Sequence, residues 1–168
     1  MDQSGNFLET IRATLQSQKK LAERAMSQLE GGDLHWAPHP ESNSIAIIVK
    51  HLAGNMRSRW TDFLSSDGEK PTRNRDGEFV DDLGDEDEIM AVWEQGWAVL
   101  FSTLSELRPT DLQRKVTVGG KELTAVEALL GQLAHYAQHV GQIVYLAKLR
   151  LGDGWETVSI PKKRTDTA

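Results

Sequence analysis

Two histidines near the end of the chain have the spacing of a metal-binding pair. His135 and His139 lie four residues apart in LLGQLAHYAQHVGQIV, which has the apolar periodicity of a largely buried helix. Residues at this spacing lie about 40° apart around a helix axis, so both imidazoles can reach one ion. His51 lies in a second apolar segment, from which a third imidazole could reach the pair. The three histidines predict a site for one divalent metal ion.

The amino-acid composition narrows the chemistry of such a site. The chain has no cysteine, so thiolate ligands, disulfides and a cysteine nucleophile are excluded. Histidine, carboxylate and water remain as ligands, and neutral imidazole binds zinc, nickel, copper or iron. Three histidine ligands leave at least one coordination position open for water or substrate, as in catalytic rather than structural sites.

A structural role for these histidines is the alternative. A buried histidine more often forms hydrogen bonds in a core than binds a metal, and the pair lacks the glutamate of the H-E-x-x-H motif. His35 and His39 lie in a proline-rich loop and are expected to be structural or exposed. The acidic run at residues 85–88 is interpreted as a helix start rather than a carboxylate metal site. The sequence has no nucleophile elbow, phosphate-binding loop or dinucleotide fingerprint.

Length and charge limit the class of protein. The 168 residues are enough for one domain with a sizeable core, and we expect a single domain over residues 1–168. A formal net charge of -6 argues against nucleic-acid and membrane partners, since both require a basic patch. No apolar run approaches the ~20 residues that cross a bilayer, and the N-terminal residues lack an apolar signal core. A cytoplasmic location is therefore expected.

Four segments that could carry these residues have helical periodicity, namely residues 6–29, 44–64, 86–107 and 125–151. Asn43 and Ser44 are cap candidates for the second helix, and Thr124 with Glu127 forms a capping box for the last. Residues 114–123 predict two short strands around a Gly-Gly turn. The tail at residues 162–168 is expected to be frayed.

Four long helices with little strand predict an all-α four-helix bundle, with a small β-hairpin before the fourth helix. The segment at residues 65–85 between the second and third helices is rich in charge, glycine and proline. Loops of this length are uncommon and usually functional or mobile, although a solvated connection is an equal alternative. Because this crossover can span the bundle, both up-down-down-up and up-down-up-down connectivity remain open.

The segments NSIAIIVKHLAGN and HYAQHVGQIVYLAK resemble the DinB-like superfamily. NMRSRWTDFLSSDGEKPTRNRDGEF and WETVSIPK resemble a bacterial branch of unknown function within it. The resemblance covers nearly the whole chain and implies a four-helix bundle with up-down-down-up connectivity, often a homodimer. It also implies a metal triad from the second and fourth helices, whose ion is usually assigned as zinc or nickel, and this triad matches His51, His135 and His139.

The resemblance implies several activities, because characterised relatives are bacillithiol- or mycothiol-dependent transferases, a mycothiol-dependent isomerase and metal-dependent hydrolases. The leading hypothesis is a metal-dependent transferase that joins a low-molecular-weight thiol to an electrophilic substrate. A metal-bound thiol loses its proton near neutral pH, which provides a nucleophile that this cysteine-free chain lacks. In this hypothesis Asn55 orients a bound group, and Arg57 or Arg59 holds a substrate carboxylate, with exposed salt bridges as the alternative role of each arginine.

Two further hypotheses remain open. The first is a metal-dependent hydrolase, for which Asp62 is the sequence-based choice of general base, although it lies about three helical turns from His51. The second is a non-enzymatic module that binds a metal or a partner. Fold resemblance alone does not choose among these activities.

Overall fold

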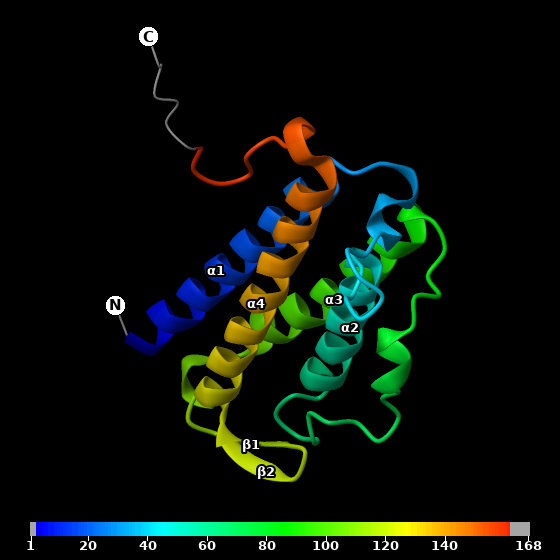
Figure 1. Ribbon diagram of the computed structural model, residues 1–168. Helices are drawn as coiled ribbons and strands as arrows, with labels where there is room; N and C mark the ends of the chain where they lie inside the picture. The colour runs from blue at the N-terminus through cyan, green and yellow to red at the C-terminus, as the bar shows by residue number, and fades with distance from the viewer. Residues whose placement is uncertain (1–2, 162–168) are drawn as a thin grey trace.

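Four long helices make up most of the computed structural model, which describes residues 3–161 (Figure 1). They are α1 (Gln3–Met26), α2 (Ile45–Trp60), α3 (Glu86–Glu106) and α4 (Ala125–Leu151). Strands β1 (Lys115–Val118) and β2 (Lys121–Thr124) form an antiparallel hairpin before α4, which confirms the predicted class and the hairpin. Four single turns of 3-10 helix complete the described chain: η1 (Gly31–His35), η2 (Asp76–Phe79), η3 (Pro109–Asp111) and η4 (Gly152–Gly154). The tail expected to be frayed lies outside the described residues.

Side-chain caps determine where three of these helices begin. The Ser44 hydroxyl accepts a hydrogen bond from the Ile47 N–H at the start of α2, as predicted. At the start of α4, Thr124 accepts from the Glu127 N–H while the Glu127 carboxylate accepts from the Thr124 N–H. This reciprocal pair is the predicted capping box. The acidic run at residues 85–88 is indeed a helix start, because Asp85 caps α3.

Two predicted helix ends were wrong by about one turn. Helix α2 was expected to continue to Leu64 but ends at Trp60, because Asp62 has a φ of 51°, which right-handed helix does not allow. Helix α1 was expected to span residues 6–29 and instead covers Gln3–Met26. The Leu29 N–H bonds to the Met26 carbonyl in a tight turn, so Leu29 stays buried and extends the apolar pattern past the helix.

The helices run up, down, down and up, so the up-down-up-down alternative is excluded. Helices α2 and α3 are parallel neighbours, since Gly96 packs on Ala53 while Thr103 Oγ1, seven residues further along α3, donates to the carbonyl of Trp60. Figure 1 shows α1 and α4 side by side and running in the same direction, opposite to α2 and α3. The crossover at residues 61–85 makes this order possible by returning the chain to the end of the bundle where α2 began.

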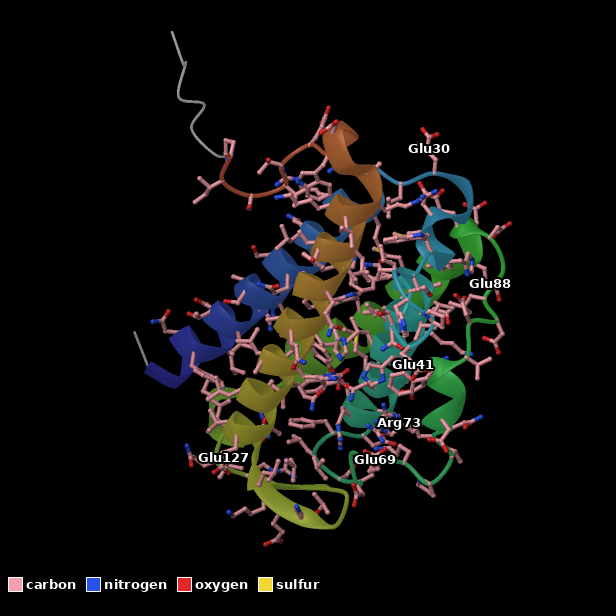
Figure 2. The ribbon with its side chains drawn as sticks, viewed as in Figure 1. Glu30, Glu41, Glu69, Arg73, Glu88 and Glu127 are labelled. Atoms are coloured by element: carbon pink, nitrogen blue, oxygen red, sulfur yellow. The ribbon has the colours of Figure 1, made fainter. Side chains whose placement is uncertain are left out.

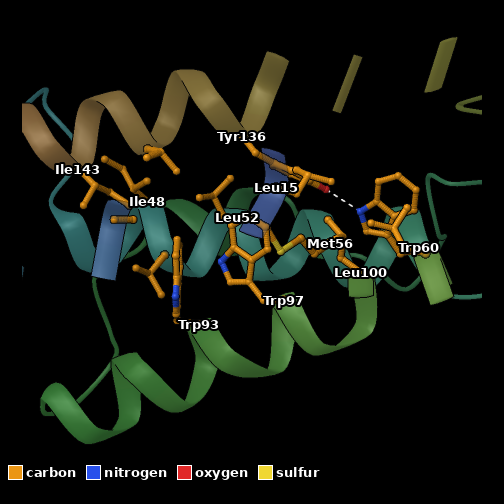
Figure 3. Close-up of a cluster of buried hydrophobic side chains, with 14 of the residues drawn as sticks. Leu15, Ile48, Leu52, Met56, Trp60, Trp93, Trp97, Leu100, Tyr136 and Ile143 are labelled. Carbon is orange, nitrogen blue, oxygen red and sulfur yellow. Dashed lines mark hydrogen bonds between the residues drawn. The ribbon is translucent and has the colours of Figure 1, made fainter. Parts of the chain in front are cut away.

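Large aromatic side chains fill the centre of the bundle (Figure 3). Trp60 of α2, Trp93 and Trp97 of α3, and Tyr136 of α4 are each at most 1% exposed. Burial of this much apolar area is the main stabilising contribution to such a core. Within residues 3–161, no helix combines the length and apolar character needed to span a bilayer.

The crossover is ordered against α2 rather than projecting into solvent. Residue 54 must be small, because a Cβ there would collide with the Glu78 carboxylate of η2. Further along the crossover, Asp81 accepts hydrogen bonds from the Ser44 hydroxyl at 2.8 Å and from His35 Nδ1 at 2.7 Å. The other nitrogen of the His35 ring lies 2.8 Å from the Gly84 carbonyl oxygen. The crossover is therefore fastened along the length of α2.

Gly96 sets the close approach of α3 to α2. A Cβ at this position would lie 2.8 Å from the Cα of Ala53, and backbone atoms can give way only if the helices move apart. We expect Gly96→Ala to lower the free energy of unfolding by about 1–3 kcal/mol, despite the higher helix propensity of alanine. Gly141→Ala is the control, because no atom lies within 4 Å of a Cβ there, and it should be stabilising by about 0.5–1 kcal/mol. Urea denaturation measures both, and equal stability of the two variants would contradict this packing.

His35 gives the fold a pH dependence. Both ring nitrogens face acceptors, so the ring that carries a proton on each nitrogen is favoured. Burial lowers the pKa of His35, but the hydrogen bonds to Asp81 and Gly84 raise it more. The stabilisation is complete below the unfolded pKa of about 6.5 and is lost as pH rises through the raised folded pKa. The loss of unfolding free energy in His35→Asn should therefore be larger at pH 6 than at pH 9. Substitution of the exposed His39 is the control. A loss of unfolding free energy in His35→Asn that does not vary with pH would contradict the assignment.

Candidate metal centre

Three imidazoles from two antiparallel helices meet at one point. Helix α2 provides His51, and α4 provides His135 and His139. The Nε2 atom of His135 lies 3.2 Å from Nε2 of His51 and 3.1 Å from Nε2 of His139. Ligand nitrogens about 2.0–2.1 Å from a tetrahedral ion are roughly 3.3–3.4 Å apart. These two separations are therefore close to those that one ion requires, and all three ligand atoms lie within 4.8 Å of one another.

Neighbouring side chains determine which ring nitrogens carry protons. His51 Nδ1 lies 3.0 Å from Glu78 Oε2, and a carboxylate can only accept, so the proton is on Nδ1. His139 Nδ1 lies 2.7 Å from Gln142 Oε1 and donates in the same way. The Nε2 atoms of His51 and His139 are therefore the nitrogens left to bind a metal, and both face His135.

His135 completes a set of donors that fits a cation. A single proton on its Nε2 cannot serve both neighbouring nitrogens in full, so one contact brings two lone pairs together. Its Nδ1 is buried and has no hydrogen-bond partner among residues 3–161. One divalent ion at the common point would satisfy all three lone pairs, so these residues fit a metal.

The electrostatics of the site favour the neutral imidazoles that metals bind. Burial lowers the pKa of His135 to about 4, and the nearby His139 and His51 add to this effect. Burial also lowers the pKa of His139, against the opposing hydrogen bond to Gln142. Both rings are therefore uncharged at neutral pH, and a metal has no proton to displace from either.

Glu78 on η2 accepts a hydrogen bond from Nδ1 of His51, the ring nitrogen that faces away from the other two histidines. Arg73 in turn binds Glu78. The guanidinium of Arg73 bonds both carboxylate oxygens of Glu78 at 2.7 Å. It also reaches Glu69 at 3.1 Å, and these two residues are labelled in Figure 2. Burial raises the pKa of Glu78, but the bonds from Arg73 and His51 lower it more, so the carboxylate stays ionised. A carboxylate behind a histidine ligand fixes its ring orientation and raises its basicity.

Neither Glu78 nor Arg73 was recognised as a site residue from the sequence, and neither were Phe79 and Gln142. The Phe79 ring stacks on His51 with centroids 4.9 Å apart. The unusual length of the crossover was the available signal for Glu78, Phe79 and Arg73. Gln142 lies three residues after His139, a spacing that places it on the same helix face.

The histidines open into a cavity of about 810 Å³, lined by His51, Asn55, Arg59, Glu69, Arg73, Arg75, Phe79, Gln132, His135 and His139. Two of the residues proposed from the sequence for a pocket, Asn55 and Arg59, are among them. Arg57 instead lines a neighbouring cavity of about 560 Å³ between α2 and the crossover.

The remaining sequence candidates lie elsewhere. Asp62 lines a third cavity with Trp60, Phe63 and Leu107. His35 is bound to the crossover, and His39 accepts a hydrogen bond from the Glu41 N–H. None of the three joins the metal centre.

A family model described as protein of unknown function (DUF1572) matches residues 2–164 of the chain. No curated protein and no solved structure shows significant similarity to it.

The support of His51 by Glu78 is testable through metal affinity. We expect Glu78→Gln to weaken zinc binding about 10- to 100-fold, the usual effect of losing such an outer partner. Gly54→Ala should weaken it by a second route, because the added Cβ pushes the Glu78 carboxylate aside. His135→Ala, which removes a ligand, should weaken it further than either. Competition with a chromophoric chelator measures all three.

Glu41→Gln is the control, because Glu41 is exposed and outside the cavity. Circular dichroism establishes that each variant is folded before zinc is added. Unchanged zinc affinity in folded Glu78→Gln and Gly54→Ala would show that the carboxylate does not support the ligand.

Proposed function

This chain belongs to the DUF1572 family, which is part of the DinB-like fold family, and we propose that it binds one divalent metal ion and transfers a low-molecular-weight thiol to an electrophilic substrate. Zinc or nickel is the proposed ion. The observation that carries the proposal is the convergence of three Nε2 atoms at the wall of a cavity large enough for two small molecules. An ion held there would act as a Lewis acid that lowers the pKa of a coordinated thiol.

The chain's own residues have defined tasks in this proposal. His51, His135 and His139 hold the ion, and Glu78 with Arg73 fixes the ring of His51. Phe79 covers that ring and keeps water from one side of it. Asn55 and Arg59 line the cavity beside the histidines and are available to orient a substrate. Since the chain has no cysteine, the sulfur nucleophile must come from a bound thiol.

Hydrolysis has less support because it needs a free base near the attacking water. Among the residues that line the cavity, the one carboxylate is Glu69, and it is paired with both Arg59 and Arg73. Glu78 is paired with Arg73 and His51. Thiol transfer does not require a carboxylate base, since coordination already favours the thiolate.

Incubation of zinc- or nickel-loaded protein with bacillithiol and monochlorobimane tests the activity. The sulfur bonds to the carbon that carries chlorine, chloride leaves with the bonding electrons, and the thiol proton passes to solvent. We expect bimane fluorescence to rise faster than with metal-free protein, and the increment to disappear in His135→Ala.

His39→Ala is the matched control, because it removes an imidazole outside the cavity and should keep the full rate. A metal-loaded, folded protein that gives no rate above background would contradict the proposal for this thiol and acceptor. Bound metal without thiol binding would instead support a non-enzymatic metal-binding module.

A further inference from the structure

A buried hydrogen-bond relay fixes the orientation of the Asn55 amide. The Trp60 indole N–H lies 2.8 Å from the Tyr136 hydroxyl oxygen (Figure 3), and an indole nitrogen can only donate. Tyr136 therefore accepts from Trp60 and gives its own proton to Asn55 Oδ1, at 3.0 Å. Because Tyr136 is fully buried, no water competes for that proton. The Asn55 oxygen is thus turned toward the core, and its NH2 group remains as a donor.

This NH2 group belongs to the cavity of the histidines. Asn55 lines the cavity one helical turn beyond His51, and in the described part of the chain no acceptor bonds its Nδ2. Arg59 follows one turn later on the same wall. One of its terminal nitrogens bonds Glu69 at 3.0 Å, whereas its Nε and Nη1 atoms are buried without a partner among residues 3–161.

The residues that line the cavity also carry an excess of positive charge. Arg59, Arg73 and Arg75 line it, and Glu69 is the single acidic residue that does so. Counting Glu78 behind His51 still leaves the guanidinium groups in excess. A divalent ion on the histidines would add further positive charge. Such a cavity favours a ligand that carries negative charge.

We propose that the cavity binds a carboxylate group of the thiol, with Asn55 and Arg59 as its partners, while the sulfur reaches the histidines. The inference rests on the proposed function and specifies its thiol as an acid. A guanidinium donates charge-assisted hydrogen bonds to carboxylate oxygens, which are stronger than bonds to a neutral acceptor. Asn55 and Arg59 lie about 6 and 12 Å beyond His51 along the helix axis, so the carboxylate must be several bonds from the sulfur.

Mercaptocarboxylates and mercaptoalcohols of equal length test this assignment on cobalt-loaded protein. The sulfur-to-cobalt charge-transfer absorption reports binding, and the probes are 3-mercaptopropionate, 4-mercaptobutyrate and the corresponding alcohols. We expect the acids to bind about 10- to 100-fold more tightly than the alcohols, as hydrogen bonds to a charged group imply. Arg59→Met should remove most of this preference. Asn55→Asp, which keeps the acceptor for Tyr136 but replaces NH2 by an anionic oxygen, should remove or reverse it.

Arg57→Met is the matched control, because it removes a guanidinium from the same helix outside the cavity and should keep the preference. Equal affinity for acids and alcohols in the unmodified protein would overturn this inference while leaving thiol transfer intact. Absence of the charge-transfer band with every thiol would instead overturn the proposed function.

A measurement without any thiol distinguishes failure of the carboxylate site from failure of thiol binding. The indole N–H resonance of Trp60, assigned with Trp60→Phe, reports the relay that ends at Asn55. Butyrate should shift this resonance in the unmodified protein and not in Asn55→Asp, whereas butanol should leave it in place. No shift with butyrate would overturn the carboxylate site whether or not a thiol binds.

Discussion

The site depends on three imidazole nitrogens held within a few ångströms of one another, with too few protons to satisfy every contact between them. Such an arrangement of neutral imidazoles is unfavourable on its own and becomes favourable when a cation occupies the common point. Two of the rings cannot turn away, because Glu78 holds His51 and Gln142 holds His139. Folding therefore creates a contact that a cation would relieve, so the free energy of the proposed metal binding would add to the stability of the bundle.

The crossover determines whether this arrangement can exist. Glu78 reaches His51 because position 54 has no side chain, and its carboxylate is charged because Arg73 bonds both oxygens. The connectivity explains why the segment is present at all. Parallel neighbours such as α2 and α3 require a connection that runs back along the bundle, and in this protein that connection also carries the outer support of a metal ligand.

The sequence was sufficient for features that depend on local spacing. The interval of four residues places His135 and His139 together, and Ser44 and Thr124 locate two helix starts through their own backbone bonds. It was insufficient where position depends on the path of an irregular segment, as for Glu78. Arg57 and Arg59 were equivalent candidates by residue type, yet two residues rotate a helix by about 200°, so they line different cavities.

Because the crossover is hydrogen-bonded to α2 at His51, its exposure to proteases would depend on an ion held by the three histidines. Arg75 is an exposed cleavage site for trypsin, and it lies three residues before Glu78. Proteases cut such a segment when it detaches transiently from the rest of the protein, and detachment breaks the contact between Glu78 and His51. An ion that binds only the closed arrangement makes detachment rarer in proportion to its occupancy. If the histidines hold an ion as proposed, the lifetime of the intact chain under digestion would measure metal saturation without knowledge of the substrate.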